Sequence, residues 1–346
     1  MILALVDKLQ PHPAWVRWGL LTTGLLFALA LPWTLYPPVA TDILCWALFA
    51  VAFDLLLGHA GQLSFGHAAF WGTSAYTTGL IAIHSGLPFF VAVFGGAVAA
   101  GVLALPIGYL AVRTTGIYFA MVTLAFAQMV YFIANQWGSV TGGENGLQGI
   151  PRTMPGADLS DPFLYYYAAL PFILLGLFAA WRIVHSPFGR VIAGVRENPA
   201  RVRALGYSAD RGKLVVFTVS AFLSGLAGGL YAINHGFASL QEVYWTTSGK
   251  VVVMTVLGGI GTLWGSVLGA GIVVRLEDWL STSGFEATQL VTGSLFIVVV
   301  LLFRRGLWGT VQHALRARRT AGAPEREPRR EEDREDHEDA AERVPS

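Results

Sequence analysis

The sequence predicts an all-α polytopic membrane protein with eight to ten transmembrane helices, of which we favour ten. Hydrophobic residues make up 54% of the 346-residue chain and charged residues only 13%, about half the share of roughly 25% that soluble domains carry. Several apolar runs approach the length of about 20 residues that a helix needs to cross the hydrocarbon core. The runs are continuous and do not alternate with polar residues, so they favour helices over the strands of a membrane barrel.

The first two thirds of the chain contain seven apolar runs. Residues 1–14 form a predicted cytoplasmic segment, and residues 15–36 follow as a first helix. We interpret this helix as uncleaved, although a signal-peptidase-like Ala-Leu-Ala sequence ends at Ala30. Two prolines then interrupt the chain, because proline does not continue a helix. The later runs cover residues 39–57, 62–84, 88–112, 116–135, 163–184 and 214–234.

The last third of the chain is harder to divide into helices. Residues 251–261 are short for a crossing, residues 262–280 end among charged side chains, and residues 287–303 stop before two arginines. The glycine-rich stretch GGIGTLWGSVLGAG at 258–271 predicts a broken or re-entrant segment, whose helix ends could meet a charged solute near the middle of the membrane. A tightly packed glycine turn is the alternative, and a re-entrant form would lower the helix count to nine or eight.

The distribution of charge predicts which loops face the cytoplasm. With ten crossings and both termini inside, 20 of the 23 Lys and Arg residues lie on the cytoplasmic side, in agreement with the positive-inside rule. The polar segment 186–213 is then cytoplasmic, whereas the loop 136–162 is periplasmic or extracellular. Arg152, Lys250 and Arg275 remain on the outer side.

The chain is therefore expected to have one transmembrane domain, residues 15–305, followed by a cytoplasmic tail. The tail, residues 306–346, carries ten acidic residues and five arginines from residue 321 onward. Since a segment of this composition cannot bury a hydrophobic core, we expect most of the tail to be disordered.

Small residues at helical spacing predict close helix contacts in three places, one of which is Ser220, Ser224 and Gly228 in the run 214–234. Gly72 lies on a face of small residues within the third apolar run, and Gly261, Gly265 and Gly269 repeat every four residues near the end of the domain. Such faces let membrane helices approach closely.

Polar residues in and near the third apolar run indicate a translocation path. Gln62, Ser64 and His67 are neighbours in the sequence, and Tyr118 at the start of the fifth run is a further candidate. Polar groups at membrane depth usually face the interior of a bundle or a water-filled path. Asp54, near the cytoplasmic end of the second run, is weighed for the same role, and helix packing is the alternative for each residue.

No site for catalysis, a cofactor or a metal ion is predicted. Cys45 is the single cysteine, and the eight histidines lack the HExxH spacing of a zinc protease. The stretch from Gly206 to Gly212-Lys213 has five residues between its glycines where a phosphate loop has four, and Leu214 replaces the required Ser or Thr. The chain should therefore not hydrolyse ATP itself. Its basic cluster lies at the predicted membrane face, so nucleic acid is not an expected partner.

Four stretches resemble one family of membrane proteins. They are GHAGQLSFGHAAFWGTSAYTTGL, RTTGIYFAMVTLAFAQMVYFIANQWGSVTGGENGLQGI, SPFGRVIAGVRENPARVRALG and VLGGIGTLWGSVLGA. In this order they are similar to the permease subunit of branched-chain amino-acid ABC importers, the LivM type, over about residues 42–303. Residues 115–150 separate this type from its shorter LivH-type partner. Asp54 departs from the resemblance, because asparagine is expected there in many relatives.

The resemblance implies a permease that works within a larger assembly. Its partners would be a second permease subunit of the LivH type, two cytoplasmic ATP-binding subunits that hydrolyse ATP, and a periplasmic solute-binding protein, with membrane lipid around them. No cofactor would be bound by this chain. The outer loop, with Glu144 and Asn145, would meet the loaded binding protein.

The segment 186–213 resembles the coupling loop of ABC importers. The resemblance implies a short helix, over about Pro187–Val195 or Pro199–Leu205, that docks in a groove of the ATPase. Pro199 suits the first turn of a helix and Gly206 suits its end. A solvated basic loop would explain the charge but not these paired helix signals. The implied coupling residues are Arg190, Arg196, Glu197, Asn198, Arg201 and Gly206.

The function implied by the resemblance is transport of Leu, Ile or Val across the bacterial inner membrane by alternating access, driven by the separate ATPases. A permease of the same family for urea, short amides or another small organic solute is the alternative. A stand-alone secondary transporter and an intramembrane hydrolase are further hypotheses. The hydrolase finds little support, because Gly61–Gly66 is one residue too long for a GxSxG nucleophile elbow.

Overall fold

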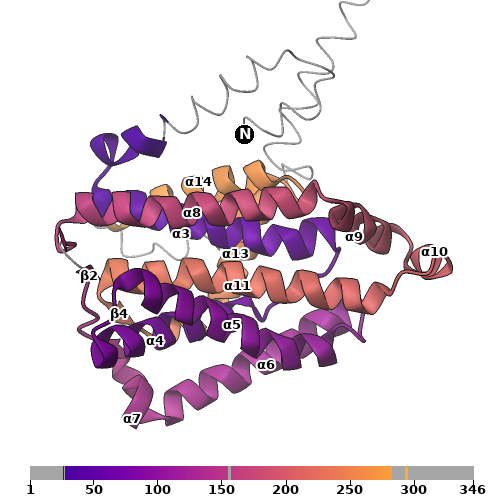
Figure 1. Ribbon diagram of the computed structural model, residues 1–346, viewed down its shortest axis with the longest axis horizontal. Helices are drawn as coiled ribbons and strands as arrows, with labels where there is room; N and C mark the ends of the chain where they lie inside the picture. Colours follow the sequence, from indigo (N-terminus) through magenta and orange to yellow (C-terminus); the bar gives the residue numbers. More distant parts are fainter. Residues whose placement is uncertain (1–25, 27, 155–156, 283–292, 295–346) are drawn as a thin grey trace, which may run out of the picture. The chain divides into compact units, whose positions relative to one another are not determined.

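The computed structural model describes residues 26, 28–154, 157–282 and 293–294, and most of them are helical (Figure 1). The long helices are α3 (Pro37–Asp54), α4 (His67–Ser85), α5 (Phe89–Ala111), α6 (Ile117–Gln136), α8 (Pro162–Val184), α11 (Ala209–His235), α13 (Trp245–Gly258) and α14 (Leu263–Thr282). The short helices are α7 (Gly138–Thr141), η2 (Gly143–Asn145), α9 (Pro187–Glu197), α10 (Pro199–Ala204) and α12 (Leu240–Val243). The prediction of an all-α fold is confirmed.

Two small antiparallel pairs of strands accompany the loop between α6 and α8. They are β1 (Leu147–Gln148) with β4 (Phe237–Ala238), and β2 (Thr153–Met154) with β3 (Ala157–Asp158). Because β4 follows α11 directly, the first pair fixes the loop to the end of that helix.

Five helices have the length and hydropathy to cross a membrane: α3 with its continuation η1 (Leu55–His59), α5, α6, α8 and α11. Helices α13 and α14 pass the same test as a pair, which is bent by 117° at the break between them. The part of the chain that the structure describes therefore has five spans, or six if the bent pair is one span. The protein is a multi-pass membrane protein, and the predicted break within 258–271 is present.

The ten-helix count stays a prediction. The predicted run 287–303 lies almost wholly outside the described residues, and the run 15–36 lies largely outside them. The N-terminal segment 1–14 and the tail 306–346 also lie outside. Helix α4, which was predicted as a span, is not among the five helices that meet the length and hydropathy limits.

Helix α11 lies at the centre of the helix bundle. It packs against α3, α4, α5 and α8, and Figure 1 shows it between α3 and α5. Its buried face includes Ser220, Ser224, Gly225 and Gly228. At Gly228 an added Cβ would lie 2.3 Å from a backbone carbonyl oxygen of α4. Small residues on α11 are therefore what lets the neighbouring helices approach it so closely.

Three of the four other glycines predicted to mediate packing lie at close helix contacts. An added Cβ would lie 2.4 Å from a side chain of α12 at Gly72, 2.4 Å from a carbonyl oxygen of α13 at Gly265, and 1.9 Å from another at Gly269. The fourth, Gly261, turns the chain with a φ of +77°. The backbones of α13 and α14 are therefore almost in contact where the two helices cross.

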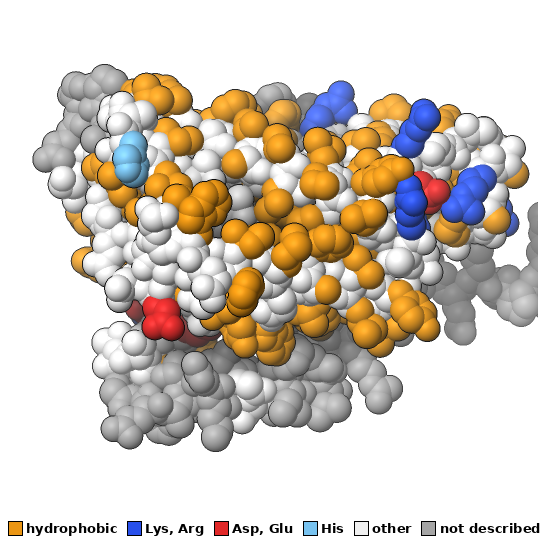
Figure 2. All heavy atoms as spheres, turned by 90° about the horizontal axis from the view of Figure 1, so that it is seen from below, with side chains coloured by type: hydrophobic (Ala, Val, Ile, Leu, Met, Phe, Trp, Pro, Cys, Tyr) orange, Lys and Arg blue, Asp and Glu red, His pale blue; other side chains and the backbone are white. Residues whose placement is uncertain are grey.

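The outward faces of α5 and α6 are strongly apolar. Figure 2 shows hydrophobic side chains over the middle of this face and Lys and Arg side chains gathered at one end. Phe94, Val102, Met121 and Phe132 are each more than half exposed. A soluble protein rarely leaves so large an apolar patch in water, so this surface suits lipid or another membrane subunit.

Candidate functional site

The predicted coupling segment folds into two short helices, α9 and α10. Ser186 precedes α9, and its Oγ accepts a hydrogen bond from the amide of Gly189 at 3.2 Å. Asn198 precedes α10, and its Oδ1 accepts one from the amide of Arg201 at 3.0 Å. Each helix has a proline in its first turn, where the missing N–H costs no hydrogen bond. Gly206 follows α10 with a φ of +87°, so both segments offered as the coupling helix are helical.

The two helices expose most of their side chains. Val195, Val202 and Ala209 form a small buried cluster that holds them together. Beyond α10, Leu205 and Tyr207 are 71% and 55% exposed. Exposed apolar side chains within a charged rim are typical of a surface that binds another protein. The predicted coupling residues in this rim are Arg190, Glu197, Asn198 and Arg201, all of which are exposed.

Arg196 is also exposed, but its guanidinium connects α9 to the helix bundle. Its guanidinium donates a hydrogen bond from Nη1 to the carbonyl oxygen of Gly58, in η1. Asp54 is fully buried beside it and accepts a hydrogen bond on Oδ1 from the amide of Gly261 at 2.7 Å. An added Cβ on Gly58 would lie 2.5 Å from that same amide nitrogen. We call these four residues the glycine junction, because through them α9 reaches the end of η1 and the break between α13 and α14.

The same short motif lies at the end of η1 and at the break between α13 and α14. The pattern LGxxGxL occupies residues 57–63 and again residues 257–263, 200 residues later. The second glycine has a positive φ in each copy, +70° at Gly61 and +77° at Gly261, a conformation that glycine adopts readily. The sequence predictions missed this repeat. This repeat is the signal that could have located the junction, because glycine-rich interruptions at corresponding positions of a transporter sequence point to its functional centre.

Two of the four predicted path residues come together in the interior. Nδ1 of His67 lies 3.0 Å from Oγ of Ser64, and Nε2 lies 2.8 Å from Oγ of Ser220 on α11. All three side chains are fully buried. The aromatic rings against the imidazole are those of Phe53, Phe70 and Phe217. Because this group is closed off from solvent, its role in a translocation path stays a prediction.

The other candidates for the path lie elsewhere. Gln62 is buried, and neither polar atom of its amide has a hydrogen-bond partner among the described residues. Tyr118 is 69% exposed on the surface of α6. Asp54 belongs to the glycine junction. The structure therefore separates the predicted path residues into a buried His67 group and scattered positions.

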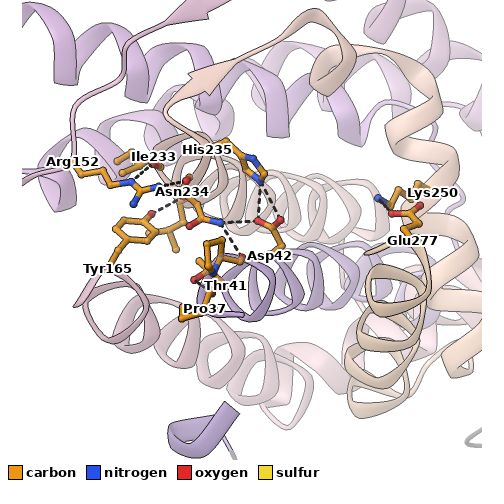
Figure 3. A network of polar contacts seen from close by, with 12 residues as sticks. Pro37, Thr41, Asp42, Arg152, Tyr165, Ile233, Asn234, His235, Lys250 and Glu277 are labelled. Atoms are coloured by element: carbon orange, nitrogen blue, oxygen red, sulfur yellow. Dashed lines mark hydrogen bonds and ion pairs between the residues drawn. The ribbon is translucent and has the colours of Figure 1, made fainter. Parts of the chain in front are cut away.

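A polar network fixes the loop between α6 and α8 to the ends of α3 and α11 (Figure 3). Arg152 donates from Nε to the carbonyl oxygen of Ile233 at 3.1 Å and from Nη2 to that of Asn234. The side-chain amide of Asn234 donates to Oδ1 of Asp42 at 2.9 Å, and Nε2 of His235 lies 3.0 Å from the same oxygen. Among the described residues, no group of three or more His, Cys, Asp or Glu side chains is placed to hold a metal ion.

Glu144 and Asn145, the predicted contacts of the binding protein, lie in η2 of the same loop and are exposed. Strand β1 follows them and pairs with β4. The pairing and the Arg152 network together hold this loop against α11, so a protein bound to the loop would contact a firmly anchored surface.

Replacing Arg152 with alanine is expected to loosen this outer end. Hydrogen bonds from charged groups typically contribute about 1.5–3 kcal/mol, so the free energy of unfolding of the purified protein should fall by about 2 kcal/mol. Arg113→Ala is the control, because that guanidinium lies 4.4 Å from the ring centroid of exposed Tyr109 and should cost less than about 1 kcal/mol. Equal losses in the two variants would contradict the role given to the network.

Comparison with known proteins shows which family this chain resembles. The family model described as the permease component of a branched-chain amino acid transport system matches residues 38–300. Similar proteins include the high-affinity branched-chain amino acid transport system permease proteins LivM of Salmonella typhimurium and Escherichia coli K12. They are 28% and 29% identical to this chain over 293 residues, covering 78% of this chain and 69% of each relative.

A shorter similarity extends to a protein with a different name. The autoinducer 2 import system permease protein LsrC of Klebsiella pneumoniae is 30% identical over 175 residues, 47% of this chain and 49% of the relative. No solved structure matches the chain. The matched region 38–300 contains the coupling helices, the glycine junction and both copies of LGxxGxL. The chain belongs to the family of branched-chain amino acid transport system permease components.

Proposed function

We propose that this chain is the membrane-spanning permease subunit of an ATP-driven importer that moves leucine, isoleucine and valine across the bacterial inner membrane. The observation that carries the proposal is the glycine junction, in which Arg196 joins the exposed pair of capped helices to Gly58 in η1, and Asp54 joins the same segment to Gly261 at the break between α13 and α14. The two LivM relatives support the substrate class, because their names assign them to branched-chain amino acid transport. The chain would leave ATP hydrolysis to its partners.

Helices α9 and α10 are placed to receive motion from an ATP-binding subunit. Leu205 and Tyr207 would enter a groove of that subunit, and the charged rim would contact its edge. When the ATP-binding subunits close, α9 would move, and Arg196 would transmit the displacement to Gly58. Because the backbones of Gly58 and Gly261 touch, α3 with η1 and the break between α13 and α14 would move together. Such coupled movement of rigid helices is what alternating access requires.

The proposed assembly contains a second permease of the LivH type, two cytoplasmic ATP-binding subunits and a periplasmic solute-binding protein. The binding protein would meet the loop 136–162 near Glu144 and Asn145. The segment 186–213 and both termini would lie in the cytoplasm, as the positive-inside rule favours. The apolar faces of α5 and α6 would contact lipid or the second permease.

A second candidate function is import of a different small solute by the same machinery, which the similarity to the autoinducer 2 permease favours. Competition for uptake separates the two. In cells that express this chain with its partners and lack other leucine uptake, excess isoleucine and valine should abolish entry of radiolabelled leucine. Urea and acetamide should have no effect. Competition by urea or acetamide, and not by valine, would favour the alternative.

Replacing Gly206 with valine is expected to uncouple uptake from ATP hydrolysis. The positive φ of Gly206 costs a β-branched residue about 1–2 kcal/mol, so the turn from α10 into α11 would shift and α10 would no longer fit its groove. Uptake should fall by about tenfold, while the binding protein still captures its substrate.

Gly86→Val is the matched control for this change. Gly86 also has a positive φ and open space around it, but it ends α4 away from the coupling helices, so uptake should be nearly normal. Glu197→Ala tests the same surface as Gly206→Val without a change in backbone. Normal uptake in both Gly206→Val and Glu197→Ala would contradict the coupling role.

A further inference from the structure

Lys250 on α13 and Glu277 on α14 form an ion pair within the depth of the membrane helices (Figure 3). Nζ of Lys250 lies 2.5 Å from Oε2 of Glu277 and 4.1 Å from the centroid of the Trp46 ring. Lys250 is five residues from the start of α13 and Glu277 is five residues from the end of α14, or roughly 8 Å at a rise of about 1.5 Å per residue. The sequence predicts that Lys250 lies on the outer side of the membrane, and this topology stays a prediction.

A charged pair at this depth is not expected to face lipid. Intramembrane Lys and Glu side chains almost always face a bundle interior or a water-filled cavity, and they mark the paths of substrates. Lys250 and Glu277 neutralise each other's charge but are not fully buried, since their side chains are 27% and 28% exposed. From this rule we expect the exposed side of α13 and α14 to line an aqueous passage.

An aromatic cluster with unused hydrogen-bonding groups adjoins the pair. Trp46 stacks on Trp71 with ring centroids 5.0 Å apart, and Tyr231 lies against both rings. Tyr231 is also near enough to Glu242 and Glu277 to interact electrostatically with both. Leaving buried polar groups unpaired is costly, so their presence beside a charged pair points to a ligand. The groups without a partner among the described residues include Nε1 of Trp71, the hydroxyl of Tyr76 and Oε2 of Glu242.

We propose that Lys250 and Glu277 form a binding site for the zwitterionic head group of the transported α-amino acid. The carboxylate of the solute would bind the ammonium of Lys250, and the ammonium of the solute would bind the carboxylate of Glu277. Two ion pairs would replace one, and the net charge of the site would stay zero. The aliphatic side chain of the solute would rest against the aromatic cluster.

The ion pair also gives the site a means of selection. A neutral solute such as urea offers no full charge to either side chain, so breaking the pair would leave both charges without compensation, which is strongly unfavourable away from bulk water. A zwitterionic solute compensates both charges, because its carboxylate would pair with Lys250 and its ammonium with Glu277. The inference rests on the proposed function, because it names the residues that would recognise the substrate class proposed above.

The charge swap Lys250→Glu with Glu277→Lys tests the site. It keeps one ammonium and one carboxylate between α13 and α14, so the helices stay joined, but it reverses the orientation in which a zwitterion can bind. In proteoliposomes that contain the whole importer, leucine uptake should fall by about tenfold or more. ATP hydrolysis stimulated by the binding protein should stay within about twofold of wild type. Wild-type uptake in the swapped variant would overturn the proposal, since the pair would then serve only to join the helices.

A neighbouring ion pair provides the matched control. Arg275 and Asp278 pair with each other on α14 alone, so the swap Arg275→Asp with Asp278→Arg should leave uptake within about twofold of wild type. The neutral pair Lys250→Met with Glu277→Gln should lose uptake as the charge swap does, and retained uptake would overturn the site.

The wild-type complex separates failure of this inference from failure of the proposed function. If wild type imports leucine and the swapped Lys250 and Glu277 variant does too, the binding site is wrong and the permease function stands. If wild type imports another solute but no leucine, the proposed substrate class itself is contradicted.

Discussion

Replacing Arg196 with alanine is expected to lower ATP-driven leucine uptake by about tenfold or more, because a hydrogen bond from a charged donor contributes about 1.5–3 kcal/mol. The bond joins α9 to the carbonyl oxygen of Gly58. Without it, α9 would follow the ATP-binding subunit while α3 and η1 stay behind. The complex should remain assembled and hydrolyse ATP, but few solute molecules should enter for each ATP consumed.

Two further variants make this result specific. Arg196→Lys keeps the charge but loses the planar fork of the guanidinium, so its uptake should be intermediate. Arg113→Ala removes another arginine of the predicted cytoplasmic side, at the end of α5, and should import normally. The measurement is the number of leucine molecules imported per ATP hydrolysed. A wild-type ratio in Arg196→Ala would show that the glycine junction does not transmit motion.

Replacing Gly269 with alanine is expected to prevent correct folding of the α13–α14 pair. The added Cβ would lie 1.9 Å from the carbonyl oxygen of Met254 and 2.9 Å from the amide nitrogen of Gly258. Both are backbone atoms of α13, so neither can rotate away as a side chain would. Overpacking typically costs about 1–3 kcal/mol where side chains can adjust, and here we expect about 3 kcal/mol or more. The yield of folded, monodisperse protein should fall sharply.

Two glycines in the same helices serve as controls for Gly269→Ala. Gly249 on α13 has nothing within 4 Å of its added Cβ, and Gly271 on α14 meets only a side-chain carbon at 3.7 Å. Alanine at either position should fold at least as well as wild type, since glycine weakens a helix interior by about 0.5–1 kcal/mol relative to alanine. Similar yields for all three variants would show that α13 and α14 are not packed as closely as described.

The long helices were largely predictable because their ends are marked locally. Helix α5 spans Phe89–Ala111 where residues 88–112 were predicted, and α8 spans Pro162–Val184 where residues 163–184 were predicted. Proline, glycine and charged residues at the ends of these runs determine where the helix begins or stops, because they affect the backbone next to them. The non-helical stretch 60–66 was not predictable in this way. It is held by distant partners, such as the bond from the amide of Phe65 to the hydroxyl of a threonine on α6 at 3.2 Å.

In the candidate site, too, the sequence predicted what local signals determine and missed what distant contacts determine. Asn198 followed by proline is a local capping signal, so the coupling helices could be anticipated. The inward direction of Arg196 could not, because its partner Gly58 lies 138 residues earlier. His67 likewise finds Ser220 on α11, 153 residues away. Contacts over such separations leave no local pattern, and the repeat of LGxxGxL marks only the contact between Gly58 and Gly261.

Leucine uptake by proteoliposomes, with and without the partner subunits, tests the proposed permease function most directly. We predict that vesicles containing this chain, a second permease, the ATP-binding subunits and the binding protein import leucine only when ATP is supplied. Vesicles that contain this chain alone should import none, whether or not an ion gradient is present. Uptake by this chain alone, driven by an ion gradient and insensitive to ATP depletion, would contradict the proposal and identify a stand-alone secondary transporter.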